Sequence, residues 1–262
     1  ENGVAYLFEA SVGGGIPIIR PMINDLAQNH IKEINGILNG TTNYILTQMS
    51  ECGADFDSTL KEAQKKGYAE ANPAADIEGT DAARKIVILS ALSFGKMLPV
   101  GKLHVEGITK ISGDDIKAAK GAGYSVKLIA HAEFKDGRIL AMVSPRFVPE
   151  SDPLYGVSDV FNGISVDTDM LGKTMFYGRG AGKLPTASAV VADMIDAVMH
   201  GRNAARPNEI LSATDSDIFD FGEYECKVAY RFADGRLEFL TEKEKDAFGG
   251  RFSSAVSRIR CL

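Results

Sequence analysis

Apolar and polar residues follow two spacings along this chain, one typical of strands and one typical of helices. Short apolar runs predict strands at residues 4–8, 31–38, 100–108, 161–166 and 175–177. Two longer runs, 126–134 and 138–147, flank an Asp136-Gly137 pair and predict a β-hairpin. Helical spacing predicts helices from about residue 16, from 41, over 56–66, over 80–94, over 112–122 and over 184–200. This order predicts an α/β or α+β fold, with a mixed sheet and helices on one face.

Composition excludes several classes of function. The chain has 262 residues and a net charge of −6 without a long basic run, so we expect no nucleic-acid partner. No apolar run is long enough to span a bilayer, so we expect no membrane partner. Cys52, Cys226 and Cys261 lie far apart without a CxxC pair, which predicts free thiols and a cytoplasmic location. The four histidines lack the spacing of a zinc site.

The stretch 67–85 concentrates charged side chains around one helix start. Gly67 ends a helical pattern, and Pro73 keeps the following segment from forming one continuous helix. Asp81 and Lys85 are four residues apart, so they share one face of the next helix, which is apolar beyond Arg84. Two interpretations remain open on spacing alone. One is a polar pocket on an apolar floor, and the other is a solvated loop with an ordinary helical ion pair.

Two glycine-rich turns precede predicted helices. Residues 13–15 match neither GxGxxG nor a phosphate-binding loop ending in GK[ST], so they predict a tight turn into a helix. Residues 178–182 open the helix at 184–200, and exposed N–H groups at such a start can hold a phosphate.

Four segments resemble the homoserine dehydrogenase family. The pattern A-x-x-x-G-Y-A-E-x-N-P-x-x-D-I-x-G-x-D-x-x-x-K, at 63–85, is similar to the family signature. E-A-x-V-x-G-G-x-P near the N-terminus, NGTTNYI at 39–45 and GxGAGxxPTASAVxxD from 178 also resemble it. The resemblance runs from about residue 4 to 201. It implies reversible, NAD(P)-dependent oxidation of L-homoserine to L-aspartate 4-semialdehyde, in the biosynthesis of threonine, methionine and isoleucine.

The resemblance also implies roles for individual residues. Lys85 would be the catalytic acid and base, with Asp81 orienting it and holding substrate. Glu70 would bind the substrate ammonium group, and Asp76 would support these residues. Gly67 and Gly182 would lie near the NAD(P) cofactor. A monovalent cation, sodium, would be held by Glu9, Val12, Gly14 and Ile16, because oxygen ligands suit a hard cation.

The chain departs from the family pattern at the nucleotide-binding domain, because no strand–GxGxxG–helix segment is present. We therefore expect the last strand of that domain at 1–9, a substrate-binding, catalytic and dimerisation domain at 10–175, and a helix returning to the nucleotide domain at 176–203. Residues 204–262 are expected to be a tail of uncertain order. The apolar hairpin suggests a homodimer. We expect the isolated chain to be inactive; the alternative is a non-catalytic dimerising domain left by truncation.

Overall fold

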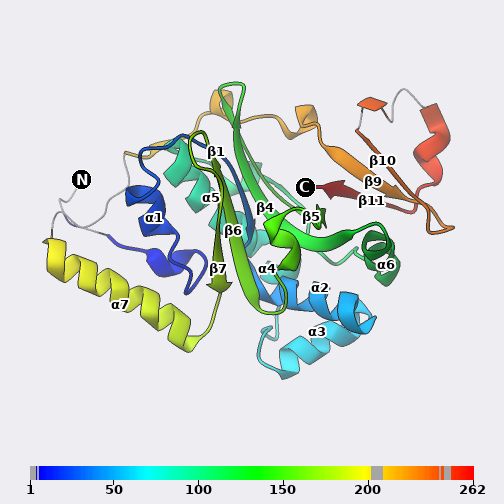
Figure 1. Ribbon diagram of the computed structural model, residues 1–262, viewed down its shortest axis with the longest axis horizontal. Coiled ribbons are helices and arrows are strands. Elements are labelled where there is room, and N and C mark those ends of the chain that lie inside the picture. Colours follow the sequence, from blue (N-terminus) through cyan, green and yellow to red (C-terminus); the bar gives the residue numbers. More distant parts are fainter. Residues whose placement is uncertain (1–3, 5, 202–208, 242, 245–248) are drawn as a thin grey trace.

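A mixed, nine-stranded sheet forms the centre of the molecule (Figure 1). The computed structural model describes residues 4, 6–201, 209–241, 243–244 and 249–262. The sheet order is β10-β9-β11-β5-β4-β1-β6-β7, and β3 also pairs with β5. The strands of this sheet are β1 (Ile31–Ile37), β3 (His104–Val105), β4 (Tyr124–Lys135), β5 (Arg138–Pro149), β6 (Phe161–Thr168), β7 (Gly172–Arg179), β9 (Lys227–Arg231), β10 (Leu237–Thr241) and β11 (Ser257–Cys261). A separate pair joins β2 (Lys96–Met97) to β8 (Leu211–Ser212).

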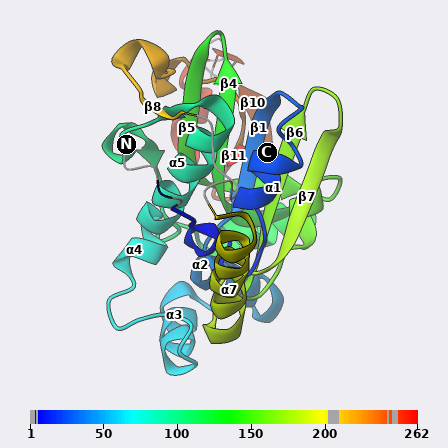
Figure 2. The ribbon, with the colours of Figure 1, turned by 90° about the vertical axis from the view of Figure 1, so that its left-hand side faces the viewer.

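Helices cover one face of this sheet (Figure 2). The α-helices are α1 (Ile19–Asn24), α2 (Gly40–Cys52), α3 (Phe56–Lys65), α4 (Ala74–Ile77), α5 (Thr80–Phe94), α6 (Gly113–Gly121) and α7 (Lys183–His200). Buried residues of α1, α2, α5 and α6 share one apolar core with strand residues such as Ile34, Ala130 and Val143. The predicted fold class, with helices on one face, is confirmed. None of the described helices is both long and apolar enough to cross a bilayer.

The predicted hairpin is formed by β4 and β5, which pair over their full lengths. Asp136 and Gly137 both have positive φ, 51° and 77°, as a two-residue hairpin turn requires. The hairpin lies in the interior of the sheet, between β1 and β11, and one face packs on the chain's own helices. Its apolar character is therefore explained within one chain and does not by itself require a second copy.

The opposite face of the sheet is more polar. Successive side chains of a strand point to opposite faces, so His131 and Glu133 point away from the core that contains Ala130 and Ala132. The 3₁₀ turn η3 (Pro153–Gly156) covers one part of this face with a small apolar cluster. The segment 219–224 covers another part.

Two predicted strands are wrong or much shortened. Val4 and Tyr6–Phe8 take no strand conformation, and position 5 lies outside the described residues. A strand needs a neighbour to bond its N–H and C=O groups, and no described strand pairs with this run. The run 100–108 contains a 3₁₀ turn (Val100–Lys102) and the two-residue strand β3.

Two helix starts also differ from prediction. α1 begins at Ile19 instead of about residue 16, because the turn at 13–16 is closed by an Ile16 N–H bond to the Gly13 carbonyl. α2 is capped by Asn39, not Thr41, since the Asn39 side chain accepts from the Thr42 N–H.

The C-terminal part is more ordered than predicted. β9, β10 and β11 extend the main sheet, and β11 pairs in parallel with β5 (Figure 1). The prediction of a poorly ordered tail was wrong because β9 is stabilised by pairing with β11, which lies about thirty residues further along the chain. Local sequence patterns do not reveal such a distant pairing. Residues 202–208 and part of 242–248 lie outside the described residues.

Candidate active site

A tight turn between α4 and α5 brings two aspartates together. Gly79 precedes α5 with φ of 84°, a conformation that favours glycine. A β-carbon there would also come within 3.2 Å of Val143 and 3.3 Å of Val105. The turn therefore places Asp76, on α4, beside Asp81 in the first turn of α5.

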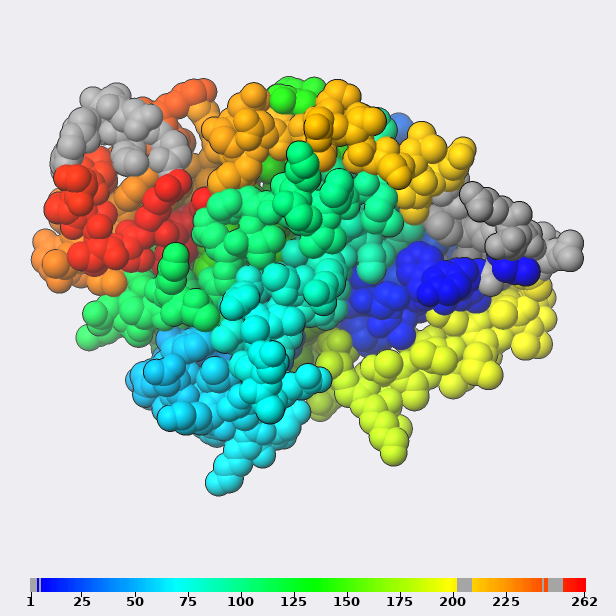
Figure 3. Space-filling model, turned by 180° about the vertical axis from the view of Figure 1, so that it is seen from behind, coloured from blue at the N-terminus to red at the C-terminus, as the bar shows by residue number. Residues whose placement is uncertain are grey.

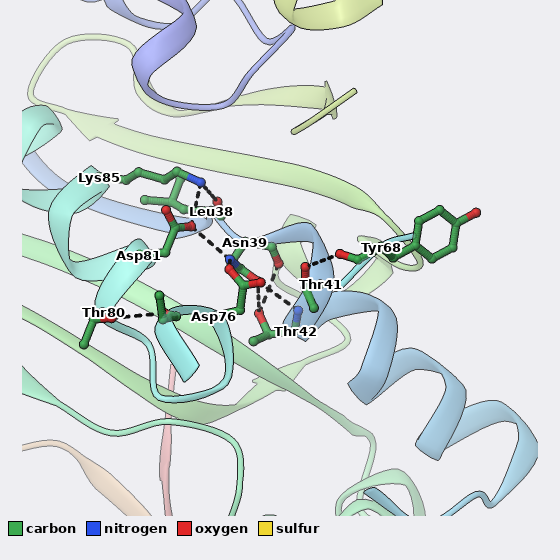
Figure 4. Close-up of polar contacts among 10 residues, drawn as sticks. Leu38, Asn39, Thr41, Thr42, Tyr68, Asp76, Thr80, Asp81 and Lys85 are labelled. Carbon is green, nitrogen blue, oxygen red and sulfur yellow. Dashed lines mark hydrogen bonds and ion pairs between the residues drawn. The ribbon is translucent and has the colours of Figure 1, made fainter. Parts of the chain in front are cut away.

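Asn39 joins these two aspartates (Figure 4). Its Nδ2 donates to Asp76 Oδ1 at 2.7 Å and to Asp81 Oδ2 at 2.9 Å. Its Oδ1 accepts from the Thr42 N–H at 2.9 Å, so the same side chain caps α2. Sequence reasoning did not select Asn39 as a site residue, although it begins the NGTTNYI segment.

Lys85 lies one turn further along α5. Its Nζ donates to Asp81 Oδ2 at 2.7 Å and to the Leu38 carbonyl at 3.0 Å (Figure 4). The Lys85 side chain is 22% exposed and that of Asp81 is 28% exposed, so this is a half-buried pair and not a solvated one. The residue that follows β1 and the first turn of α5 therefore hold the amine in place.

A polar pocket of about 330 Å³ opens beside this cluster. It is lined by Gly67, Tyr68, Ala69, Glu70, Asn72, Ala75, Asp76, Asp81 and Arg84. Glu70 is exposed on the loop after α3, and Gly67 ends that helix with φ of 76°. The exposed side chain of Arg84 also lines the pocket.

The second glycine-rich turn lies near the start of α2. A β-carbon on Gly180 would fall 2.1 Å from the Asn162 side chain, and one on Gly40 would fall 3.8 Å from Asn162 Oδ1. Asn162 is therefore packed between this turn and the residue that follows Asn39. Gly182 is exposed and precedes α7 without a side-chain cap, so the first N–H groups of α7 are open to a ligand.

The first glycine-rich turn packs against the second. Gly15 donates its N–H to the Arg179 carbonyl at 3.0 Å, and a β-carbon on Gly14 would overlap the Gly180 carbonyl. Glu9 is buried, and its carboxylate accepts from the N–H groups of Ile18, Ile19 and Arg20 at 2.7–2.9 Å. The carboxylate thus caps α1, a role that the sequence did not indicate.

The fold and the pocket define an α+β enzyme domain, with a lysine and carboxylates at a helix N-terminus above an apolar core. The family model described as homoserine dehydrogenase matches residues 17–195. The chain belongs to the homoserine dehydrogenase family.

Named relatives agree with this assignment. Homoserine dehydrogenases of Neisseria gonorrhoeae and Synechocystis are each 50% identical to this chain, over 75% and 76% of its length. The chain covers 45% and 47% of those proteins, about half of their length.

Solved structures support the same fold. A homoserine dehydrogenase of Thiobacillus denitrificans has a TM-score of 0.85 and 33% identity. That match covers 97% of this chain and 69% of the other. The part of the chain after residue 201, which lies outside the sequence resemblance, is therefore largely covered by this structural match. A hyperthermophilic archaeal homoserine dehydrogenase in complex with NADPH has a TM-score of 0.65 and 32% identity, over 78% of this chain and 58% of the other.

Proposed function

We propose that this chain forms the catalytic portion of an enzyme that reversibly oxidises L-homoserine to L-aspartate 4-semialdehyde with NAD(P). This reaction would serve threonine, methionine and isoleucine biosynthesis in the cytoplasm. The observation that carries the proposal is the Lys85 amine, held between Asp81 and the Leu38 carbonyl next to a polar pocket. Family membership supports it.

Lys85 is proposed to move the proton of the reacting hydroxyl. A lysine ammonium has three N–H donors, and Asp81 and Leu38 accept two of them. The third is left for a substrate oxygen. During oxidation the neutral amine takes the hydroxyl proton as the neighbouring carbon loses hydride, and during reduction the ammonium returns the proton to the aldehyde oxygen. NAD(P), when bound, supplies the hydride acceptor or donor.

The acidic residues are proposed to hold the amino-acid end of the substrate. Glu70 is exposed at the mouth of the pocket, where a carboxylate can pair with the substrate ammonium group. Asp81 orients Lys85 and contacts substrate, and Asp76 supports it through Asn39.

The open start of α7 fits the cofactor. Its first N–H groups, from Gly182 onward, can bond a phosphate, and Gly67 lines the pocket described above. α7 also exposes a run of apolar side chains: Leu184, Val190, Val191, Met194, Ile195, Val198 and Met199. Figure 3 shows this helix at the margin of the molecule beside the N-terminal segment. These features support the proposal that 176–203 returns to a nucleotide-binding domain; 202 and 203 lie outside the described residues.

The sodium site remains a proposal. The Glu9 carboxylate accepts two backbone N–H bonds on Oε1 and one on Oε2, so Oε2 keeps an acceptor position for a cation. The remaining proposed ligands, Val12, Gly14 and Ile16, would act through backbone carbonyls, and Gly14 has the positive φ of a sharp turn. We assign no catalytic step to this cation.

A homodimer remains part of the proposal, on different grounds from the hairpin. β7 is an edge strand, with no described strand paired along one of its sides, and Tyr177 on it is 55% exposed. Met170 and Leu171, in the turn before β7, are also exposed. Light scattering at the mass of a monomer would contradict this assembly.

The decisive experiment is Lys85→Ala in the full-length enzyme, with homoserine oxidation followed by NAD(P)H absorbance. The turnover number kcat should fall by about 10²–10⁴, the range for a lost acid or base, or roughly 3–5 kcal/mol of barrier. The matched control is Lys117→Ala, which removes an exposed lysine of α6 and should leave kcat unchanged. A folded Lys85→Ala enzyme with wild-type kcat would refute the assignment.

Two further measurements test the substrate and the cofactor parts. Glu70→Gln should raise KM with a smaller loss of kcat, the pattern of lost uniform binding. The 262-residue chain alone should bind NAD(P) weakly and show no turnover. Homoserine oxidation by that purified chain would contradict the second expectation.

A further inference from the structure

A second polar pocket, of about 500 Å³, lies on the sheet face opposite the helices. Its lining includes Glu33 on β1, His131 and Glu133 on β4, Arg146 on β5, and Tyr224. It shares no lining residue with the pocket beside Lys85. The proposed dehydrogenase reaction does not use it.

His131 presents a hydrogen-bond acceptor to this pocket. Asn35 donates its Nδ2 to Glu33, which turns the Asn35 Oδ1 toward His131 Nδ1 at 2.8 Å. The Nδ1 atom must then carry the ring proton. Burial, with Arg146 and Lys135 nearby, lowers the pKa of His131 well below its usual value, so the ring is neutral. Its Nε2 lone pair is buried and has no partner among the described residues.

Two carboxylates add to this acceptor group. Glu33 and Glu133 lie directly opposite each other on β1 and β4. Like charges in that position destabilise a sheet. Burial and the charge of Glu33 raise the pKa of Glu133, although Lys135 and Arg146 act against this shift. Glu133 Oε1 is buried without a described partner, and Oε2 lies 3.9 Å from His131 Nε2. This end of the pocket therefore fits a cationic donor such as an ammonium group.

Arg146 supplies the opposite chemistry. It is 2% exposed, its Nη2 contacts Met142 Sδ at 3.2 Å, and its Nε has no partner among the described residues. No carboxylate of the described part of the chain forms an ion pair with it within 4.0 Å. A buried guanidinium without a direct ion pair is costly, and a carboxylate is its best partner.

We propose that this pocket binds a free α-amino acid. The ligand carboxylate pairs with Arg146, and its ammonium group donates to Glu133, Glu33 and His131 Nε2. A simple anion would be repelled by the two glutamates, and a simple cation would be repelled by Arg146. A metal ion is not favoured, because the described residues contain no group of three or more His, Cys, Asp or Glu side chains able to hold one. The pocket volume leaves room for a ligand side chain.

Calorimetric titration of the purified protein tests the ligand class. Glycine is the probe, and acetate and methylammonium carry its two charges separately. Glycine should bind saturably, and each half-ligand should bind at least tenfold more weakly. Acetate that binds as well as glycine would reduce the site to an anion site and overturn the proposal. Absence of saturable glycine binding would also overturn the proposal. The pocket would then be filled by water or by a second copy of the chain.

Variants locate the binding. Glu133→Gln and Arg146→Lys should each weaken glycine binding at least tenfold, because the first removes the charge and the second removes the planar guanidinium. Glu70→Gln, in the other pocket, should leave glycine binding unchanged while it raises the KM for homoserine. NMR of the His131 ring should show a shift on glycine addition that is lost in Glu133→Gln. Glycine binding that survives Glu133→Gln, in a variant with native circular dichroism, would place the ligand elsewhere and refute the proposal.

Discussion

Replacing Asn39 tests whether one side chain organises the candidate active site. Asn39 is buried, and it both caps α2 and donates to Asp76 and Asp81. Asn39→Ala removes both functions. Asn39→Asp keeps a good helix cap but loses both donated bonds and adds a third carboxylate. The two variants together separate the cap from the bridge.

The structure gives the expected magnitudes. Loss of an N-cap costs about 1 kcal/mol, and a hydrogen bond to a charged group contributes about 1.5–3 kcal/mol. The Asp81 side chain is 28% exposed, so water replaces part of what its bond contributes. We therefore expect Asn39→Ala to lower the free energy of unfolding by about 2–4 kcal/mol. Asn39→Asp should lose at least as much, because three carboxylates then share one site.

Urea unfolding followed by circular dichroism measures stability, since the chain has no tryptophan. Homoserine oxidation by the full-length enzyme measures function. Both variants should raise KM and lower kcat, because Asp81 loses the contact that fixes it beside Lys85. Wild-type stability and kinetics in Asn39→Asp would refute the bridge and leave Asn39 a helix cap.

Three other predictions follow from buried polar contacts. Burial lowers the pKa of Lys127 from 10.5 to about 8, so between these pH values the unfolded chain binds more protons than the folded one. The free energy of unfolding should rise by on the order of 3 kcal/mol as the pH increases through that window, and Lys127→Met should show no such rise in urea titrations. Glu9→Gln should lower the unfolding free energy by about 2–4 kcal/mol, because one carbonyl cannot accept the three N–H bonds of the α1 start. Asp193→Ala should increase proteolysis near α7, because Asp193 holds Arg20 and the Glu9 N–H; unchanged cleavage would contradict this.

Elements with strong local patterns were predictable from the sequence. The β4–β5 hairpin follows from two apolar runs around Asp136 and Gly137, whose φ values suit the turn. The apolar spacing between Gly79 and Gly95 predicts α5, and these two glycines adopt left-handed conformations at its ends. In these segments local propensity and tertiary packing favour the same structure.

Elements that depend on a distant partner were not predictable. Tyr6–Phe8 has the apolar character of a strand but no described neighbour to pair with, whereas β9 is stabilised by β11. The cap of α2 shows the same dependence on a smaller scale. Asn39 and Thr41 both suit an N-cap, and the two aspartates that bond Asn39 lie about forty residues away.

The same distinction separates the two halves of the candidate active site. The Asp81–Lys85 pair follows from a four-residue spacing on one helix, so a single segment of sequence reveals it. The groups that fix this pair, the Leu38 carbonyl and the Asn39 amide, come from the end of β1, and sheet pairing rather than local pattern places them there. Strand β1 pairs with β4 on one side and β6 on the other, so the position of Asn39 depends on contacts spread over more than one hundred residues. The Asp81–Lys85 pairing can therefore be predicted from local spacing, while the residues that position it become visible only when the sheet is assembled.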